Sequence, residues 1–145
     1  VSAVTHSQPE EQDGALLAAL QDHHVDLVIL AGYMKLLGPR ILSRYRNRIL
    51  NSHPALLPKF GGKGMYGRLV HEAVLAAKEN VTGVTIHLTD EVYDHGPIVA
   101  RCQVPVVEGD TVDTLMDRVQ GRERMLWVET LQSIVRLELD LDAIG

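Results

Sequence analysis

The spacing of apolar residues changes several times along the chain, and each change predicts a new element of secondary structure. Residues 25–30, VDLVIL, form an almost continuous apolar run, which is typical of a strand buried on both faces. In residues 67–79, GRLVHEAVLAAKE, apolar positions recur every three or four residues, as they do along one side of a helix. Ser7, with Glu10 three positions on, predicts the start of an earlier helix. Together the spacings predict strands over 25–30, 48–52, 83–90 and 97–107 and further helices over 38–45, 67–79 and 110–139.

The order of these elements predicts the fold class. Strands that alternate with helices are typical of α/β proteins, in which helices cover a mostly parallel sheet. The chain of 145 residues is long enough for its own core, and no linker or repeat divides it, so we expect a single domain over residues 1–145. Ligands of such sheets bind outside the carboxyl ends of the strands, which is where candidate chemistry should lie.

One predicted strand ends in two polar side chains. In residues 49–54, ILNSHP, the strand period of two puts Asn51 and His53 on the same face. An amide donor beside an imidazole can stabilise a developing oxyanion and transfer a proton. The alternative is a strand that simply runs into the turn at Pro54.

A second strand end carries several titratable side chains. Residues 86–97, IHLTDEVYDHGP, place acidic groups and two histidines before a Gly-Pro turn. Acidic residues are common turn formers, so each of them has a purely structural explanation. A carboxylate that faced His53 across a cleft would orient the imidazole and raise its pKa. The spacing alone does not choose between Asp90 and Asp94.

Composition and charge narrow the function classes. A formal net charge of −5 and a pI of about 5.8 argue against nonspecific nucleic-acid binding, which needs a basic face. The single cysteine, Cys102, gives no disulfide framework and favours a reducing, cytoplasmic location. No apolar run reaches the 18 or so residues of a membrane helix, and no signal peptide is visible, so we expect no membrane partner.

Two further patterns could suggest a metal site and a dinucleotide-binding loop, but neither has the required spacing or context. The seven histidines lack the spacing of metal ligands, so no metal is expected. Residues 62–67, GKGMYG, match G-x-G-x-x-G, but they do not follow a clean strand as a dinucleotide-binding loop would. We expect a flexible loop beside the active site instead.

Four motifs give the chain a resemblance to a known family. NSHPALLPKF, HEAVLAA, VTGVTIHLTDEVYDHGPIV and VPVVEGDTVDTLMDRV resemble the phosphoribosylglycinamide formyltransferases, also called glycinamide ribonucleotide transformylases. The resemblance covers roughly residues 10–137. It implies a Rossmann-like formyltransferase fold and transfer of a formyl group from 10-formyltetrahydrofolate to glycinamide ribonucleotide in de novo purine biosynthesis. It also implies small-molecule partners only, no metal, and a monomer or homodimer.

The resemblance assigns roles to individual residues. It makes Asn51, His53 and Asp94 the catalytic set, with Asp94 as the carboxylate that tunes the histidine. It makes Glu123 a contact of the glycinamide substrate. A carboxylate in the apolar helical row of Leu115, Val119 and Leu126 supports that role independently, although a partly exposed helix edge would also explain it. The folate-binding residues that it implies are Met34, Lys35, Leu36, Leu37, Asn51, Asp90, Glu91, Val92, Tyr93 and Asp94.

The chain also departs from that family's pattern. No first strand and no Gly-Ser-rich phosphate loop precede the first helix, so we expect a fold that lacks its N-terminal βαβ unit. No arginine stands near Pro9, and Arg124 occupies the position where a histidine often follows the helical glutamate. Two alternatives to the transferase therefore stay open: a formyltetrahydrofolate hydrolase-like enzyme, in which water replaces the amine, and an inactive remnant that binds folate.

Overall fold

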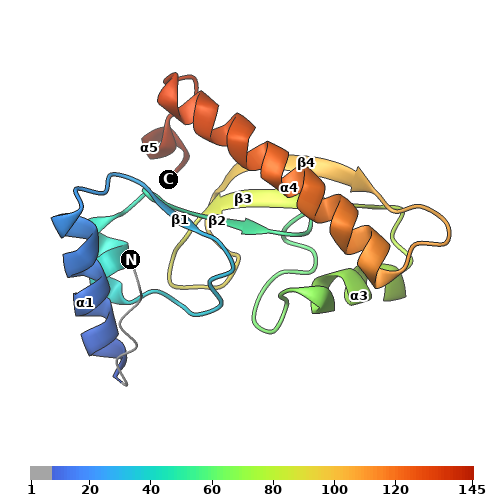
Figure 1. Cartoon of the computed structure of the whole chain (residues 1–145), viewed down its shortest axis with the longest axis horizontal. Coiled ribbons are helices and arrows are strands. Elements are labelled where there is room, and N and C mark those ends of the chain that lie inside the picture. Colours follow the sequence, from blue (N-terminus) through green and yellow to red (C-terminus); the bar gives the residue numbers. More distant parts are fainter. Residues whose placement is uncertain (1–7) are drawn as a thin grey trace.

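The computed structural model describes residues 8–145 (Figure 1). The predicted helix start at Ser7 lies outside these residues; the first helix is preceded by Gln8, which makes no side-chain cap, and has proline in its first turn. The elements in chain order are α1 (Pro9–Asp22), β1 (Val28–Leu30), α2 (Pro39–Arg44), β2 (Ile49–His53), α3 (Arg68–Ala76), β3 (Val81–Leu88), β4 (Ile98–Pro105), α4 (Val112–Val135) and α5 (Leu141–Ile144).

The sheet is mixed, and the prediction of a mostly parallel sheet is wrong for the described residues. Its strand order is β1-β2-β3-β4; β1 and β2 are parallel, whereas β3 is antiparallel to both β2 and β4. Parallel neighbours need a long crossover, but only residues 89–97 join β3 to β4, so that pair is antiparallel. Between β2 and β3 a helix is present, and the chain nevertheless returns antiparallel. Alternating elements therefore predicted the class but not the strand directions.

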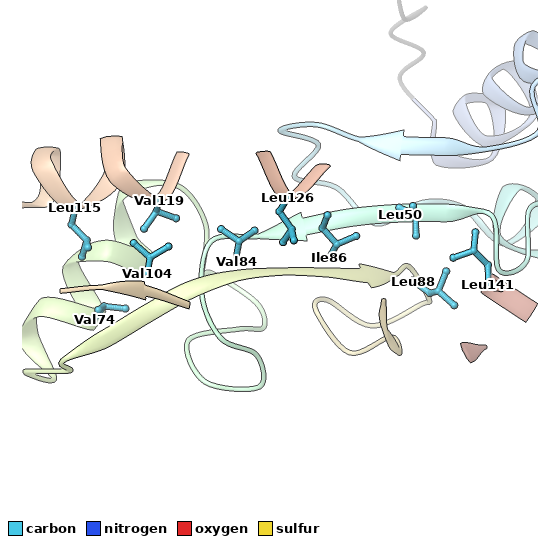
Figure 2. Packing of buried hydrophobic residues seen from close by; sticks show 10 residues of the cluster. All are labelled: Leu50, Val74, Val84, Ile86, Leu88, Val104, Leu115, Val119, Leu126 and Leu141. Carbon is cyan, nitrogen blue, oxygen red and sulfur yellow. The ribbon is translucent and has the colours of Figure 1, made fainter. Parts of the chain in front are cut away.

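Helices cover the two faces of this sheet. On one face α4 packs on β2, β3 and β4, and Figure 2 shows Leu115, Val119 and Leu126 of α4 pointing toward the strands. On the other face a smaller cluster joins α2 to β2. Its buried members are Leu37, Ile41, Tyr45 and Ile49.

The C-terminal helix and the first strand differ most from their predictions. The long helix covers Val112–Val135 and not residues 110–139; Thr111 sets its start, because it caps the first turn in a reciprocal pair with Thr114. The strand expected to be buried on both faces, β1, is an edge strand of the described sheet, and Ile29 is 41% exposed. Among residues 8–145, no helix is both long enough and apolar enough to cross a membrane.

Strand β2 separates the two sides of the molecule. Leu50 belongs to the cluster under α4, whereas Ile49 belongs to the cluster under α2. Because side chains alternate along a strand, Ser52 points to the α4 side, and Asn51 and His53 point to the opposite side. The two sides are called here the α4 face and the α2 face of β2.

Candidate active site

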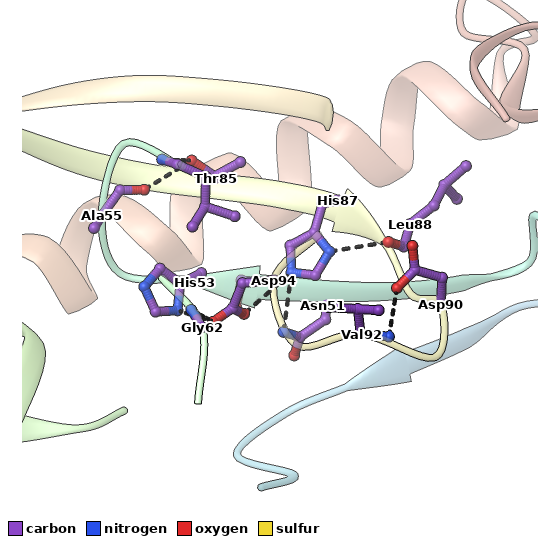
Figure 3. Close-up of polar contacts among 12 residues, drawn as sticks. Asn51, His53, Ala55, Gly62, Thr85, His87, Leu88, Asp90, Val92 and Asp94 are labelled. Carbon is purple, nitrogen blue, oxygen red and sulfur yellow. Dashed lines mark hydrogen bonds and ion pairs between the residues drawn. The ribbon is translucent and has the colours of Figure 1, made fainter. Parts of the chain in front are cut away.

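Four polar side chains meet on the α2 face of β2 (Figure 3). Asn51 and His53 come from β2, and His87 comes from β3, where it lies directly opposite Asn51 in the antiparallel register. Asp94, in the loop after β3, completes the group: its Oδ2 lies 3.4 Å from His53 Nδ1 and its Oδ1 lies 3.6 Å from His87 Nε2. The predicted trio of Asn51, His53 and Asp94 therefore converges on one place, and His87 joins it.

The loop after β3 is shaped to bring Asp94 back to the strands. A side-chain carbon on Gly96 would lie 1.7 Å from the carbonyl oxygen of Leu88, so only glycine fits this close return. Asp94 itself has a φ of 54°, a conformation that aspartate adopts more readily than most residues. The backbone N–H of Gly62 donates to its Oδ2 at 2.9 Å. Backbone geometry and a fixed donor thus hold this carboxylate in place.

The choice between the two aspartates is settled by position. Asp90 accepts from the backbone N–H of Val92 at 2.8 Å and pairs with the exposed His95 at 3.0 Å. It stabilises its own turn, as acidic turn residues usually do. Asp94 is the carboxylate that faces His53.

Burial dominates the electrostatics of this group. The side chains of His53 and Asp94 are 4% and 10% exposed. Desolvation lowers the pKa of His53, and it outweighs the Asp94 carboxylate and the Phe60 carbonyl, which raise it. The expectation that a facing carboxylate would raise the imidazole pKa is therefore wrong for the net shift. Burial opposes ionisation of Asp94 as well, but the neighbouring His87, the charge of His53 and the Gly62 N–H together lower the pKa of that carboxyl.

Both ring nitrogens of His53 face acceptors. Nε2 lies 2.6 Å from the carbonyl oxygen of Phe60, to which it can only donate, and Nδ1 faces Asp94. A second proton on Nδ1 would therefore lie against a carboxylate. Because burial keeps the pKa of the ring low, such a proton is readily given up, which suits a proton donor.

His87 fixes the amide of Asn51. Its Nδ1 lies 2.9 Å from the carbonyl oxygen of Leu88 and donates to it, so in the neutral ring Nε2 is the acceptor. The Asn51 amide nitrogen lies 3.2 Å from this Nε2 and donates to it. One amide hydrogen is then committed to His87, and the other is free for a ligand. The sequence analysis gave His87 no role, because only the antiparallel register places it opposite Asn51.

A cavity of about 590 Å³ opens beside this group. Met34 and Tyr93, from the two segments expected to bind folate, line it, and the Tyr93 hydroxyl donates to the Met34 carbonyl at 3.3 Å. The loop of residues 62–67 lines it too. The other expected residues of the first segment lie elsewhere: Leu37 is buried in the core under α2, and Leu36 and Leu37 border a separate cavity of about 210 Å³.

The remaining expected folate contacts do not line the 590 Å³ cavity. These are Lys35, Asp90, Glu91 and Val92. Val92 is 55% exposed, and the turn made by Asp90 holds its backbone. Tyr93 and Asp94 are the residues of that loop that do line the cavity, and Asp94 lies beside His53.

Glu123 reaches the same cavity from the α4 face of β2. The Ser52 hydroxyl donates to its Oε1, and the Trp127 indole N–H donates to the Ser52 oxygen at 3.2 Å. Ser52 and Trp127 were missed in the sequence analysis. The i, i+4 spacing of Glu123 and Trp127 was visible, but nothing in it showed that Ser52 would lie beneath them.

Among residues 8–145, no three His, Cys, Asp or Glu side chains are grouped closely enough to hold a metal ion. The side chains of the site that line the cavity include an amide (Asn51), an imidazole (His53) and two carboxylates (Asp94 and Glu123). Such a set can donate a hydrogen bond to an oxyanion, move a proton and accept from an amine.

Comparison with known proteins shows to which family this chain belongs. A sequence profile described as "Formyl transferase" matches residues 2–131. Over 119 residues the chain is 44% identical to the chloroplastic phosphoribosylglycinamide formyltransferase of Vigna unguiculata, which covers 82% of this chain and 38% of that relative. Over 134 residues it is also 44% identical to the phosphoribosylglycinamide formyltransferase of Mycobacterium tuberculosis, covering 92% of this chain and 60% of that relative.

Solved structures of such relatives have the same fold as this chain. The crystal structure of phosphoribosylglycinamide formyltransferase from Bacillus halodurans superposes with a TM-score of 0.81 at 39% identity, over 90% of this chain and 64% of that one. In fold, the chain is thus an α/β protein of the formyltransferase type. The chain belongs to the formyl transferase family, because the family profile spans most of its length. It spans 38% to 60% of the length of the two curated relatives named above.

Proposed function

We propose that this chain carries the catalytic residues of a phosphoribosylglycinamide formyltransferase, which moves the formyl group of 10-formyltetrahydrofolate to the primary amine of glycinamide ribonucleotide. The observation that carries the proposal is the meeting of Asn51, His53 and Asp94 at one edge of a cavity that Glu123 also lines. Relatives at 44% identity bear that enzyme's name, which supports the choice of substrates.

The chemistry follows from the donors and acceptors of the site. Attack by the amine on the formyl carbon puts negative charge on the formyl oxygen. The Asn51 amide hydrogen that His87 does not use can donate to this oxygen. The bond between the formyl carbon and the folate nitrogen then breaks, and His53, paired with Asp94, gives that nitrogen a proton. The attacking amine loses one proton, which restores His53, so that the formylated amine and tetrahydrofolate are the products. Glu123 accepts from the amine and orients it.

The donor would lie along the apolar side of the cavity. Met34 and Tyr93 border that side and are joined by the hydrogen bond from the Tyr93 hydroxyl. Mostly apolar walls with a few fixed polar groups are typical of pockets for flat heterocycles. We further propose that Leu36 and Leu37, two of the expected folate contacts that border the smaller cavity, support this wall.

The test is product analysis. The chain is mixed with 10-formyltetrahydrofolate and glycinamide ribonucleotide, and the products are identified by mass spectrometry. Formylated ribonucleotide that depends on His53 is the expected result. Release of formate without formylated ribonucleotide would indicate a hydrolase instead. Binding of folate with neither product would indicate the inactive alternative, and both of these results would overturn the proposal.

A further inference from the structure

The α4 face of β2 carries a hydrogen-bonded chain, and the proposed mechanism gives a role to only one of its members, Glu123. The hydrogen-bonded chain runs from the Trp127 indole through the Ser52 hydroxyl to the Glu123 carboxylate. We propose that Ser52 and Trp127 are positioning residues that hold Glu123 toward the cavity to receive the primary amine of the acceptor substrate. The inference rests on the proposed function, because it concerns the amine that the transferase would formylate.

The direction of each hydrogen bond in this chain is fixed by chemistry. An indole N–H can only donate, so Ser52 must be the acceptor toward Trp127. A serine hydroxyl has one hydrogen, and the Glu123 carboxylate is the acceptor beside it. The indole therefore fixes the hydroxyl oxygen, and the hydroxyl hydrogen is left for Glu123. No other arrangement satisfies both contacts when the carboxylate is ionised.

The backbone places the three groups with little freedom. Glu123 and Trp127 are four residues apart on α4, so they lie one above the other on the same side of the helix. Ser52 is fixed by β2, whose register with β3 pairs it with Ile86. The hydrophobic core holds α4 against the sheet at this point, since Leu126 of α4 and Ile86 of β3 are buried in the same cluster (Figure 2).

The charge of Glu123 is left available to a ligand. In the part of the chain that the structure describes, no lysine, arginine or histidine forms an ion pair with it, although its neighbour Arg122 pairs with Glu129. One carboxylate oxygen is occupied by Ser52, and the cavity lies next to the side chain. A preorganised carboxylate of this kind loses less freedom when it accepts from an amine than a freely rotating glutamate would.

The experiment uses Trp127 as its own reporter, because it is the single tryptophan of the sequence. Nitrogen-15 NMR of the whole chain gives one indole N–H signal, which is recorded for wild type, Ser52→Ala, Ser52→Thr and Glu123→Gln. Ser43→Ala, at an exposed position of α2, is the matched control. Each protein is then titrated with glycinamide ribonucleotide, and separately with a folate analogue.

The proposal predicts a specific pattern. Ser52→Ala shifts the indole signal without ligand and weakens ribonucleotide binding about tenfold, whereas folate binding is unchanged. Ser52→Thr, which keeps the hydroxyl, restores most of the affinity. In the Ser52→Ala/Glu123→Gln double variant the loss is no larger than in Glu123→Gln alone, because Ser52 acts through that carboxylate. Ser43→Ala matches wild type throughout.

Three results would overturn the proposal. The first is an indole signal that does not respond to Ser52→Ala, since the hydrogen bond would then be absent. The second is a response of the indole with unchanged ribonucleotide affinity. The third is a wild-type indole signal that does not shift when glycinamide ribonucleotide is added. Failure of the proposed function looks different: the indole would respond to the ribonucleotide and to Ser52→Ala as expected, but no formylated product would form.

Discussion

The two faces of β2 are built from neighbouring residues but differ in chemistry. On the α2 face, His53 and His87 are almost fully buried, their side chains 4% and 3% exposed, and both lie close to Asp94. On the α4 face, Ser52 meets a single carboxylate and an indole, and neither the hydroxyl nor the indole titrates near neutral pH. In the proposed mechanism, one strand thus separates the group that transfers a proton from the group that places the acceptor.

This difference predicts which substitutions affect which step. Changes on the α2 face should reduce the rate of formyl transfer, and they should weaken the dependence of stability on pH that the buried titratable groups of this face cause. Changes on the α4 face should affect the binding of the amine and leave that pH dependence alone.

The largest effect is expected from His53→Ala. In the proposed mechanism His53 is the group that moves the proton, and such groups typically contribute about 10²–10⁴-fold to the rate. The measurement is the turnover rate for formylated ribonucleotide. His95→Ala is the control, since that histidine is exposed and pairs only with Asp90. Equal losses in the two variants would contradict the assignment of His53.

Asn51→Ala should come next, with a loss of about 10²–10³-fold in turnover. The amide addresses the oxyanion directly, so this loss should persist when Asp94→Asn is also present. The same assay on the single and double variants measures it. An Asn51→Ala variant with wild-type turnover would show that the oxyanion is stabilised by another group.

Acid should destabilise the fold through the α2 face. Burial lowers the pKa of His53 below the usual value of 6.5, so below pH 6.5 the unfolded chain binds more protons than the folded one. The free energy of unfolding should therefore fall as the pH drops through this range, by at most about 1.4 kcal/mol per pH unit for one group. At lower pH a second loss follows, since the pKa of Asp94 lies below 3.8 in the folded state despite the burial that opposes its ionisation.

Urea denaturation between pH 8 and pH 4 measures this dependence. In His53→Gln the slope between pH 6.5 and 5 should be shallower, although buried His71, whose pKa desolvation also lowers, keeps part of it. Ser52→Ala should keep the wild-type slope. A steeper slope in His53→Gln would contradict the direction assigned to the His53 pKa.

The smallest effect is expected from Asp90→Asn. This carboxylate forms a surface pair with His95, and such pairs contribute about 0–1 kcal/mol to stability. Turnover should change by less than about threefold, in contrast to Asp94→Asn, because Asp90 faces its own turn and not His53. A large loss of turnover in Asp90→Asn would show that the two aspartates share one role.

Sequence patterns predicted the α2 face better than the α4 face for physical reasons. The strand period placed Asn51 and His53 together, and local patterns of this kind survive folding. His87 and Ser52 could not be assigned, because their partners depend on an antiparallel register and on a helix packing across 71 to 75 residues of chain. Element order likewise did not predict the strand directions: the short loop 89–97 accounts for the antiparallel pair β3–β4, but β2 and β3 are antiparallel although α3 lies between them.

The folate segments show a further limit. Residues 34–37 are contiguous in sequence, but only Met34 faces the large cavity, while Leu37 is turned into the core under α2. A motif matched as a block therefore mixes ligand contacts with core residues. Residues 34–37 form no helix or strand, so their side chains follow no fixed period. The sequence therefore could not show which of them contact a ligand and which lie in the core.

The most direct test of the central claim is a double-mutant cycle of His53→Ala and Asp94→Asn on formyl transfer. If Asp94 acts through His53, it has no function once the imidazole is gone, and the double variant should be no slower than His53→Ala alone. If the two losses multiply, Asp94 has a separate role, such as holding the loop at Gly62, and the proton-transfer pair described here does not exist.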